Sequence, residues 1–191
     1  FSLTNRIPRK TLSPKEILSE ALAIKAQGYD HVLLVSGEAQ SIVGPAYFRD
    51  ALTLLRPHFS NVSMEVQPLG QEDYEEMIPL GLHAVLVYQE TYNRETYRMH
   101  HLKGRKRNFK HRLDTPERLG RAGINKIGLG CLLGLEDWRT DLFFLGLHLR
   151  FLEKRFWRTR YSVSFPRLRP FEGESDFSLQ EVSDRQLVQA I

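Results

Sequence analysis

The sequence of 191 residues contains one cysteine, Cys131, and this scarcity excludes several kinds of site. A single cysteine cannot build an internal disulfide framework, which fits a reducing compartment and a cytoplasmic location. No cysteine and histidine spacing typical of zinc sites occurs, and His100 and His101 are adjacent instead of one helical turn apart. Cys131 lies within an apolar run, so we expect a small core residue and not a nucleophile.

Long apolar runs and common catalytic motifs are missing as well. No apolar stretch approaches the roughly 20 residues that a membrane-spanning helix needs, and no secretory signal is visible. The sequence has no Walker phosphate loop and no Gly-x-Ser-x-Gly nucleophile elbow. With 41% apolar residues and a formal net charge of +4, the composition is that of a globular domain that can bind anionic ligands without requiring nucleic acid.

The chain also lacks an initial methionine. It begins at Phe1, and its last residues, QLVQAI (186–191), have the pattern of a helix cut off in the middle. We therefore expect an excerpt from a longer protein. Its length suffices for a domain with a substantial core, so residues 1–191 are expected to form a single domain.

Short β-type runs alternate with segments of helical spacing along the chain. Ser13-Pro14-Lys15-Glu16 is a strong helix start, with a cap at Ser13 and a capping box completed by Glu16. Further helices are expected from 45, over 71–80, from 115 and over 142–156, with strands over 31–36, 62–66, 84–88, 126–132 and 161–165, and a polar surface loop over 172–183. This alternation predicts a parallel α/β sheet with right-handed crossovers, forming a barrel or an open part of one. A flavodoxin-like open sheet is the alternative.

Four of the apolar runs end in polar residues or in glycine. In parallel α/β barrels the carboxyl ends of the strands face one shared mouth, so we expect a single site built from distant parts of the chain. The four runs are LLVSGE (33–38), VYQETY (87–92), GLGCLLGL (128–135) and SFPRLRP (164–170).

The two acids at these ends each have a functional and a structural interpretation. Glu38 could accept hydrogen bonds from an ammonium group, beside a glycine, Gly37, that permits close approach of a ligand. Glu90 could bind two adjacent hydroxyls of a ribose. Equally, Glu38 could cap the next helix and Glu90 could be an acid at a helix N-terminus.

Arginines supply the opposite charge. Arg118 or Arg121 could pair with a ligand carboxylate through the fork geometry of guanidinium, although most helix arginines are merely solvated. Ser164 and Arg167 flank a proline that stiffens the backbone, which favours a carboxylate clamp; a structural salt bridge is the alternative.

Two further features are less specific. The glycines of the run 128–135 do not form a GxGxxG fingerprint, and they indicate close approach of a flat ligand or of packing helices. The basic run 103–112 is either a solvated loop or an electropositive rim for an anionic ligand or partner. A non-enzymatic α/β module that binds RNA or an acidic partner through this run is the competing function, although Phe109 is its one aromatic residue.

Taken together, these segments resemble the tyrosine-cleaving enzymes of the radical S-adenosylmethionine (SAM) superfamily over essentially the whole chain. The runs VYQETY (87–92), RLGRAGINKIGLG (118–130) and RYSVSFPRLRP (160–170) carry most of the resemblance. It implies the second to sixth strands of a partial (βα)6 TIM-like barrel. The first strand, a C-terminal extension and the three-cysteine loop that holds a 4Fe-4S cluster would lie outside the sequence, with the cluster ligands upstream of Phe1.

The resemblance also implies a function. SAM would provide a 5′-deoxyadenosyl radical, and the Cα–Cβ bond of L-tyrosine would break to give 2-iminoacetate (dehydroglycine) and p-cresol for thiamine thiazole synthesis. Ser164 and Arg167 would clamp the tyrosine carboxylate. A thiazole synthase and an electron donor are the implied partners, without nucleic acid or membrane. The tyrosine lyase of hydrogenase cofactor maturation is the runner-up, and the excerpt alone is expected to be inactive.

The resemblance assigns cofactor contacts to four places in the chain. Gly37-Glu38 would receive the methionyl ammonium group of SAM, and Glu90 would contact the ribose. Arg118 would pair with the cofactor carboxylate, and Leu133-Gly134 would pack on the adenine. These assignments agree with the physical interpretation of each residue but come from the family.

Overall fold

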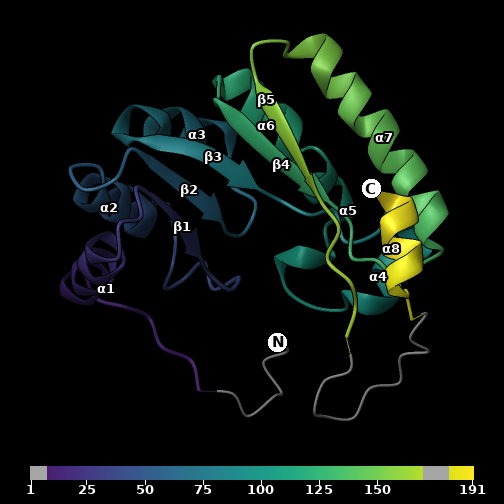
Figure 1. Cartoon of the computed structure of the whole chain (residues 1–191), viewed down its shortest axis with the longest axis horizontal. Helices are drawn as coiled ribbons and strands as arrows, with labels where there is room; N and C mark the ends of the chain where they lie inside the picture. The colour runs from purple at the N-terminus through teal and green to yellow at the C-terminus, as the bar shows by residue number, and fades with distance from the viewer. Residues whose placement is uncertain (1–7, 170–180) are drawn as a thin grey trace.

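A five-stranded parallel sheet organises the chain, and its strands follow one another in sequence order (Figure 1). The structure, a computed structural model, describes residues 8–169 and 181–191. The strands are β1 (His31–Val35), β2 (Asn61–Glu65), β3 (Leu82–Leu86), β4 (Lys126–Gly130) and β5 (Arg160–Ser164). A flavodoxin-like sheet would have placed later strands on both sides of the first. The unbroken order is that of a barrel wall, which confirms the predicted partial barrel.

Helices lie along the outside of the curved sheet, except those of residues 94–113 and the last helix, which lie near its mouth (Figure 1). This placement follows from right-handed crossovers that never reverse direction along the sheet. The helices are α1 (Pro14–Ala26), α2 (Pro45–Leu55), α3 (Gln71–Met77), α4 (Arg94–His100), α5 (Phe109–Leu113), α6 (Thr115–Ala122), α7 (Trp138–Arg155) and α8 (Asp184–Ala190), with 3-10 turns at Ile78–Leu80 and Arg105–Arg107.

The predicted helix start at Ser13 is confirmed. The backbone N–H of Ser13 donates to Glu16 Oε2 at 2.9 Å, and the Glu16 N–H donates to Ser13 Oγ at 3.4 Å. The predicted helix 71–80 is confirmed as α3 followed by a 3-10 turn, because Pro79 lacks the N–H that would continue the α-helix. The helical pattern at the end of the chain corresponds to α8.

The core fills the space between the sheet and the helices. Its most buried side chains include Phe48, Leu52, Met64, Tyr74, Val85, Leu119 and Ile127. Cys131 belongs to this core, where burial raises the pKa of its thiol to about 12. The thiol therefore stays protonated at neutral pH, in agreement with the prediction of a small core residue.

One edge of the sheet is formed by β1, whose side chains alternate between core and surface. Val32 and Leu34 pack against the core, whereas Leu33 and Val35 are 44% and 67% exposed. Within the described ranges, no helix has the length and apolar character to cross a membrane. The segment 172–183, predicted as a surface loop, lies outside the described residues except for its last three.

Candidate functional site

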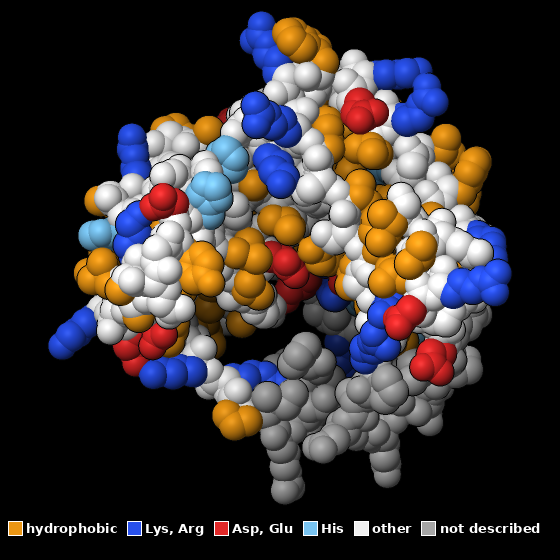
Figure 2. Space-filling model, in the orientation of Figure 1, with side chains coloured by type: hydrophobic (Ala, Val, Ile, Leu, Met, Phe, Trp, Pro, Cys, Tyr) orange, Lys and Arg blue, Asp and Glu red, His pale blue; other side chains and the backbone are white. Residues whose placement is uncertain are grey.

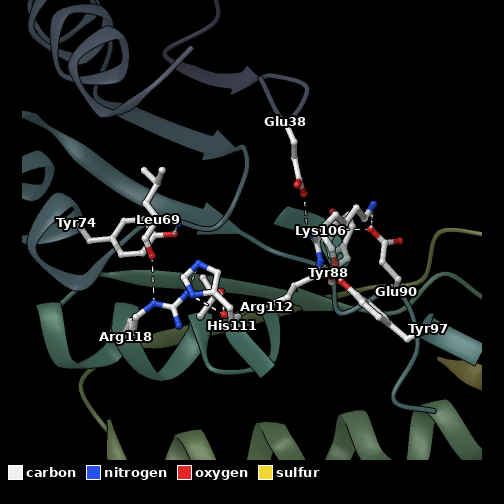
Figure 3. Close-up of polar contacts among 11 residues, drawn as sticks. Glu38, Leu69, Tyr74, Tyr88, Glu90, Tyr97, Lys106, His111, Arg112 and Arg118 are labelled. Atoms are coloured by element: carbon white, nitrogen blue, oxygen red, sulfur yellow. Dashed lines mark hydrogen bonds and ion pairs between the residues drawn. The ribbon is translucent and has the colours of Figure 1, made fainter. Parts of the chain in front are cut away.

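A buried arginine, Arg112 of α5, joins the loops that follow two different strands (Figure 3). Its Nη1 donates to Glu38 Oε1 at 2.9 Å, and its Nη2 donates to Glu90 Oε1 at 3.2 Å. Glu38 follows β1 and Glu90 follows β3, so both acids stand beyond the carboxyl ends of parallel strands. Arg112 therefore joins the two predicted acids at the mouth of the sheet, and their roles stay predictions.

Each nitrogen of the Arg112 guanidinium group has a hydrogen-bond partner. Its Nε donates to the backbone carbonyl of Tyr88 at 2.6 Å, so each of its three nitrogens has a partner. Only 10% of its side chain is exposed. A cation this deeply placed is tolerated because two carboxylates and a carbonyl replace the water it has lost.

Glu90 has an unusual backbone conformation. Its φ of 73° makes it the one non-glycine residue with positive φ in the described part of the chain. Such a conformation costs about 1–3 kcal/mol and persists where the surroundings impose it. Backbone bonds to the β4 segment hold it on both sides: the Gln89 N–H donates to Gly130 O at 2.9 Å, and the Leu132 N–H donates to Glu90 O at 2.7 Å.

Lys106 brings a second cation to Glu90. Its Nζ lies 2.6 Å from Glu90 Oε1, and the hydroxyl of Tyr97 donates to the Lys106 carbonyl. Burial alone would raise the pKa of Glu90, but the charges of Lys106 and Arg112 outweigh it and hold the pKa below its usual value. Glu90 is therefore a carboxylate at neutral pH and can accept hydrogen bonds from a cationic ligand.

A pocket opens beside these charges. Its lining combines acidic, basic and amide side chains with one proline: Glu38, Gln40, Gln67, Pro68, Arg105, Lys106, Asn108, His111 and Arg112. Figure 2 shows a hollow near the centre of this view of the molecule, with acidic side chains on its wall. A pocket that presents both signs of charge suits a ligand that carries both.

Ser164 reaches the same end of the sheet from β5. The hydroxyl of Tyr88 interacts with Ser164 and with Glu65, and burial raises the pKa of that hydroxyl. Gly130 lies directly beneath this contact, because a Cβ there would stand 2.6 Å from the Ser164 carbonyl and 2.8 Å from the Tyr88 ring. The missing side chain thus lets Tyr88 reach across the neighbouring strand.

Arg118 does not join this group, and Figure 3 shows it apart from Glu38 and Glu90. Its Nε donates to Leu69 O at 3.1 Å, and its Nη2 donates to Thr115 Oγ1 at 2.8 Å. Arg121 is exposed on α6 and pairs with a glutamate of the same helix. The role expected of Arg118 stays a prediction, and the geometry gives the central position to Arg112.

The remaining predicted residues lie where β4 and β5 end. The Leu133 N–H donates to the carbonyl of Pro166, next to Arg167, at 2.8 Å, and Gly134 has a φ of 108° that favours glycine. Arg167 Nη1 lies 2.6 Å from Asp184 Oδ1, so in this structure it forms the salt bridge that the sequence left as the alternative. The clamp role of Ser164 and Arg167 and the adenine contact of Leu133-Gly134 stay predictions.

Sequence reasoning missed Arg112 and Lys106 because both lie in the basic run 103–112. A run of cations is usually solvated, and nothing in its spacing distinguishes these two. Their pairing with Glu38 and Glu90 neutralises two charges of the run inside the molecule, and Lys110 forms an ion pair with Asp114 at the surface. This weakens the case for the run as a binding surface for RNA.

The described residues do not provide a metal centre. They contain no group of three or more histidine, cysteine or acidic side chains arranged to hold an ion. Cys131, the one thiol of the sequence, is buried and protonated. An iron–sulfur cluster therefore does not fit these residues, whereas a ligand with an ammonium and a carboxylate group fits the charges around Arg112.

Comparison with known proteins yields consistent results. A family model described as the radical SAM superfamily matches residues 2–144. The 2-iminoacetate synthases of Escherichia coli (strain K12) and Salmonella typhimurium (strain LT2) are 54% and 53% identical over all of this chain, which covers 51% of each. The chain spans about half the length of these curated relatives. The crystal structure of the FeFe-hydrogenase maturase HydG from Carboxydothermus hydrogenoformans superposes with a TM-score of 0.88 and 33% identity, over 97% of this chain and 44% of that one.

Proposed function

The chain belongs to the radical SAM superfamily, and we propose that it forms part of a lyase that uses SAM to cleave the Cα–Cβ bond of L-tyrosine. The products would be 2-iminoacetate and p-cresol, with 2-iminoacetate supplied to thiamine thiazole synthesis. Arg112 between Glu38 and Glu90 is the observation that carries the cofactor site. Similarity to 2-iminoacetate synthases over the whole chain supports the choice of reaction.

The charges around Arg112 match the amino-acid head of SAM. That head carries one ammonium group and one carboxylate. In this proposal Glu38 and Glu90 would accept hydrogen bonds from the ammonium group, in place of the ribose contact that the resemblance implied for Glu90. The Arg112 guanidinium would donate to the carboxylate, in place of Arg118. The ammonium group of Lys106, whose Nζ lies 2.6 Å from Glu90 Oε1, already makes the ion pair with Glu90 that the SAM ammonium group would make.

The contribution of this chain is to bind and to orient. When bound, SAM would supply the radical that starts the cleavage. The side chains described here would fix its head group and keep water away from it. No iron–sulfur ligands are found among them.

The substrate carboxylate would be held by Ser164 and Arg167 at the end of β5. The guanidinium of Arg167 already holds a carboxylate, that of Asp184, whose own side chain is 90% exposed. An incoming carboxylate could take the place of Asp184, because the Asp184 side chain lies almost entirely in solvent. A thiazole synthase and an electron donor remain proposed partners on the family resemblance.

Two arginine substitutions in the full-length protein test the proposal. Arg112→Met should raise the Kd for SAM by about tenfold or more, because it removes charge-assisted hydrogen bonds to the ligand. Arg167→Ala should leave that Kd unchanged and reduce p-cresol formation by about a hundredfold. Calorimetric titration measures the Kd, and chromatography measures p-cresol.

Arg121→Ala is the matched control, because this exposed arginine pairs with Glu117 within α6. It should change neither the Kd for SAM nor the formation of p-cresol. Unreduced p-cresol formation by the Arg167 variant would reject the clamp, and unchanged SAM affinity in the Arg112 variant would reject the head-group site.

The similarity to HydG favours one second candidate, a tyrosine lyase of hydrogenase maturation. The higher identity to 2-iminoacetate synthases supports the first candidate over it. Growth without thiamine of an E. coli strain that lacks its own 2-iminoacetate synthase, restored by the full-length protein, would separate the two.

A further inference from the structure

A buried aspartate on α7 reaches the segment that directly follows Glu90. Asp141 Oδ1 accepts a hydrogen bond from Thr91 Oγ1 at 3.0 Å and another from the Tyr92 N–H at 2.7 Å. Asp141 is 1% exposed and Thr91 is fully buried. These contacts cross 49 and 50 residues of sequence, so they join α7 to the loop after β3.

The position of Asp141 is costly for folding alone. Its second oxygen, Oδ2, is buried and has no hydrogen-bond partner among the described residues. A buried carboxylate with a free oxygen lowers stability compared with an apolar residue of similar size. Core packing therefore does not explain an aspartate here. Its hydrogen bonds to the Thr91 hydroxyl and the Tyr92 N–H explain it.

Those groups set the conformation of Glu90. The Gln89 N–H donates to Gly130 O and the Glu90 carbonyl accepts from the Leu132 N–H, which fixes this backbone against the β4 segment. Asp141 fixes the two residues after Glu90. Glu90 thus lies between two anchored points in a left-handed conformation that a glutamate rarely adopts.

A neighbouring acid continues the anchor further along the same segment. Glu136 Oε2 accepts from Asn93 Nδ2 and from Thr96 Oγ1, each at 2.6 Å. The turn before α7 and the first turn of α7 therefore hold residues 91–96 through two carboxylates.

We propose that Asp141 is a positioning residue that acts through Thr91 and Tyr92 to aim the Glu90 carboxylate at the cofactor head group. The inference rests on the proposed function, because it assigns Asp141 an effect on SAM binding. Asp141 touches neither Arg112 nor Glu38 by any hydrogen bond or ion pair in the described structure, so its effect must pass through Glu90.

The test compares four variants of the full-length protein by their Kd for SAM. Asp141→Ala should raise it by about tenfold, because two hydrogen bonds to a charged acceptor are lost. Asp141→Asn keeps one acceptor oxygen and should recover most of the affinity. Thr91→Val removes one of the two donors with little change of shape and should give an intermediate loss; it also serves if Asp141→Ala fails to fold.

Asp137→Ala is the matched control, because the Asp137 side chain caps the same helix by accepting hydrogen bonds from the N–H and the hydroxyl of Thr140, and the substitution leaves its backbone bonds in place. It should lower the unfolding temperature without changing the Kd. If Asp141 had a structural role alone, Asp141→Ala would likewise lower the unfolding temperature without changing the Kd for SAM. A wild-type Kd in folded Asp141→Ala, or in Thr91→Val, would therefore overturn the inference.

A double-mutant cycle separates action through Glu90 from general loosening. In a Glu90→Gln background, Asp141→Ala should raise the Kd by less than about twofold. Fully additive losses would overturn the inference. If the wild-type protein does not bind SAM, the proposed function fails and the inference fails with it. If the wild type binds SAM and the Asp141 and Thr91 variants have the same Kd, the inference fails but the proposed function stands.

Discussion

At the scale of single residues, Asp141 also makes stability depend on pH. Burial raises the pKa of Asp141 to about 6, above the value of about 4 for an exposed aspartate. The folded protein therefore binds a proton at this site more tightly than the unfolded chain does. Its contribution to the free energy of unfolding is greatest below pH 4 and decreases as the pH rises to about 6.

The variant Asp141→Asn should show the opposite trend relative to the wild type. It carries no titrating group at this position, so its unfolding temperature should rise relative to that of the wild type between pH 5 and pH 7.5. Thermal unfolding followed by circular dichroism at both pH values measures this difference. If the difference in unfolding temperature between Asp141→Asn and the wild type is the same at both pH values, Asp141 does not titrate in this interval.

The residues of the candidate site differ in how far they could be predicted. Glu38 and Glu90 follow apolar runs, and the rule that parallel strands end at one mouth places them together. Arg112 has no such signal, because its partners lie 74 and 22 residues away and its own run is rich in cations. Only the packing of α5 against the strand ends selects it.

At the scale of secondary-structure elements, two helical glycines have opposite surroundings. A Cβ added at Gly120 of α6 would stand 2.5 Å from the ring of Phe156, which is too close without movement of that ring. A Cβ at Gly146 of α7 would meet nothing within 4 Å. The first glycine lets the segment after α7 pack on α6, whereas the second only weakens its helix.

Alanine substitutions should therefore have opposite effects. Gly146→Ala should raise the free energy of unfolding by about 0.5–1 kcal/mol through helix propensity and a less flexible unfolded chain. Gly120→Ala should lower it by about 1–3 kcal/mol, since overpacking outweighs the same gain. Urea unfolding of both variants measures the difference, and a stabilised Gly120 variant would contradict this account of the contact.

Most elements could be predicted from sequence, but the two short helices at the mouth could not. The five strands and α1, α2, α6 and α7 have apolar periodicity or clear caps. Helices α4 and α5 contain 7 and 5 residues, too few to show a periodic pattern. They form because side chains cap them, as Asn93 and Asn108 do, and because they pack at the mouth of the sheet.

At the scale of the whole molecule, the outer edge of β1 is the exposed side of the sheet. No described strand pairs with the free backbone edge of β1, and Leu33 and Val35 add exposed apolar side chains on one face of the same strand. An apolar edge strand is a template for pairing with another chain. The 191-residue chain should therefore self-associate as its concentration rises.

A lysine at this edge should suppress the association. Val35→Lys places a charge on a side chain that is 67% exposed, so stability should change by less than about 0.5 kcal/mol. Sedimentation velocity at several concentrations measures the association. Val188→Lys on α8, at a site that is 74% exposed, is the control and should have no effect. Equal behaviour of the two variants would exclude the β1 edge as the contact.

The bridging position of Arg112 has a consequence for solution conditions. Glu38, Glu90, Lys106 and Arg112 already have internal counterions at this mouth, so the zwitterionic head of a ligand would exchange one set of ion pairs for another. Few dissolved ions are taken up or released in such an exchange. Affinity should then vary little with ionic strength, in contrast to the steep dependence seen when a basic surface binds a polyanion.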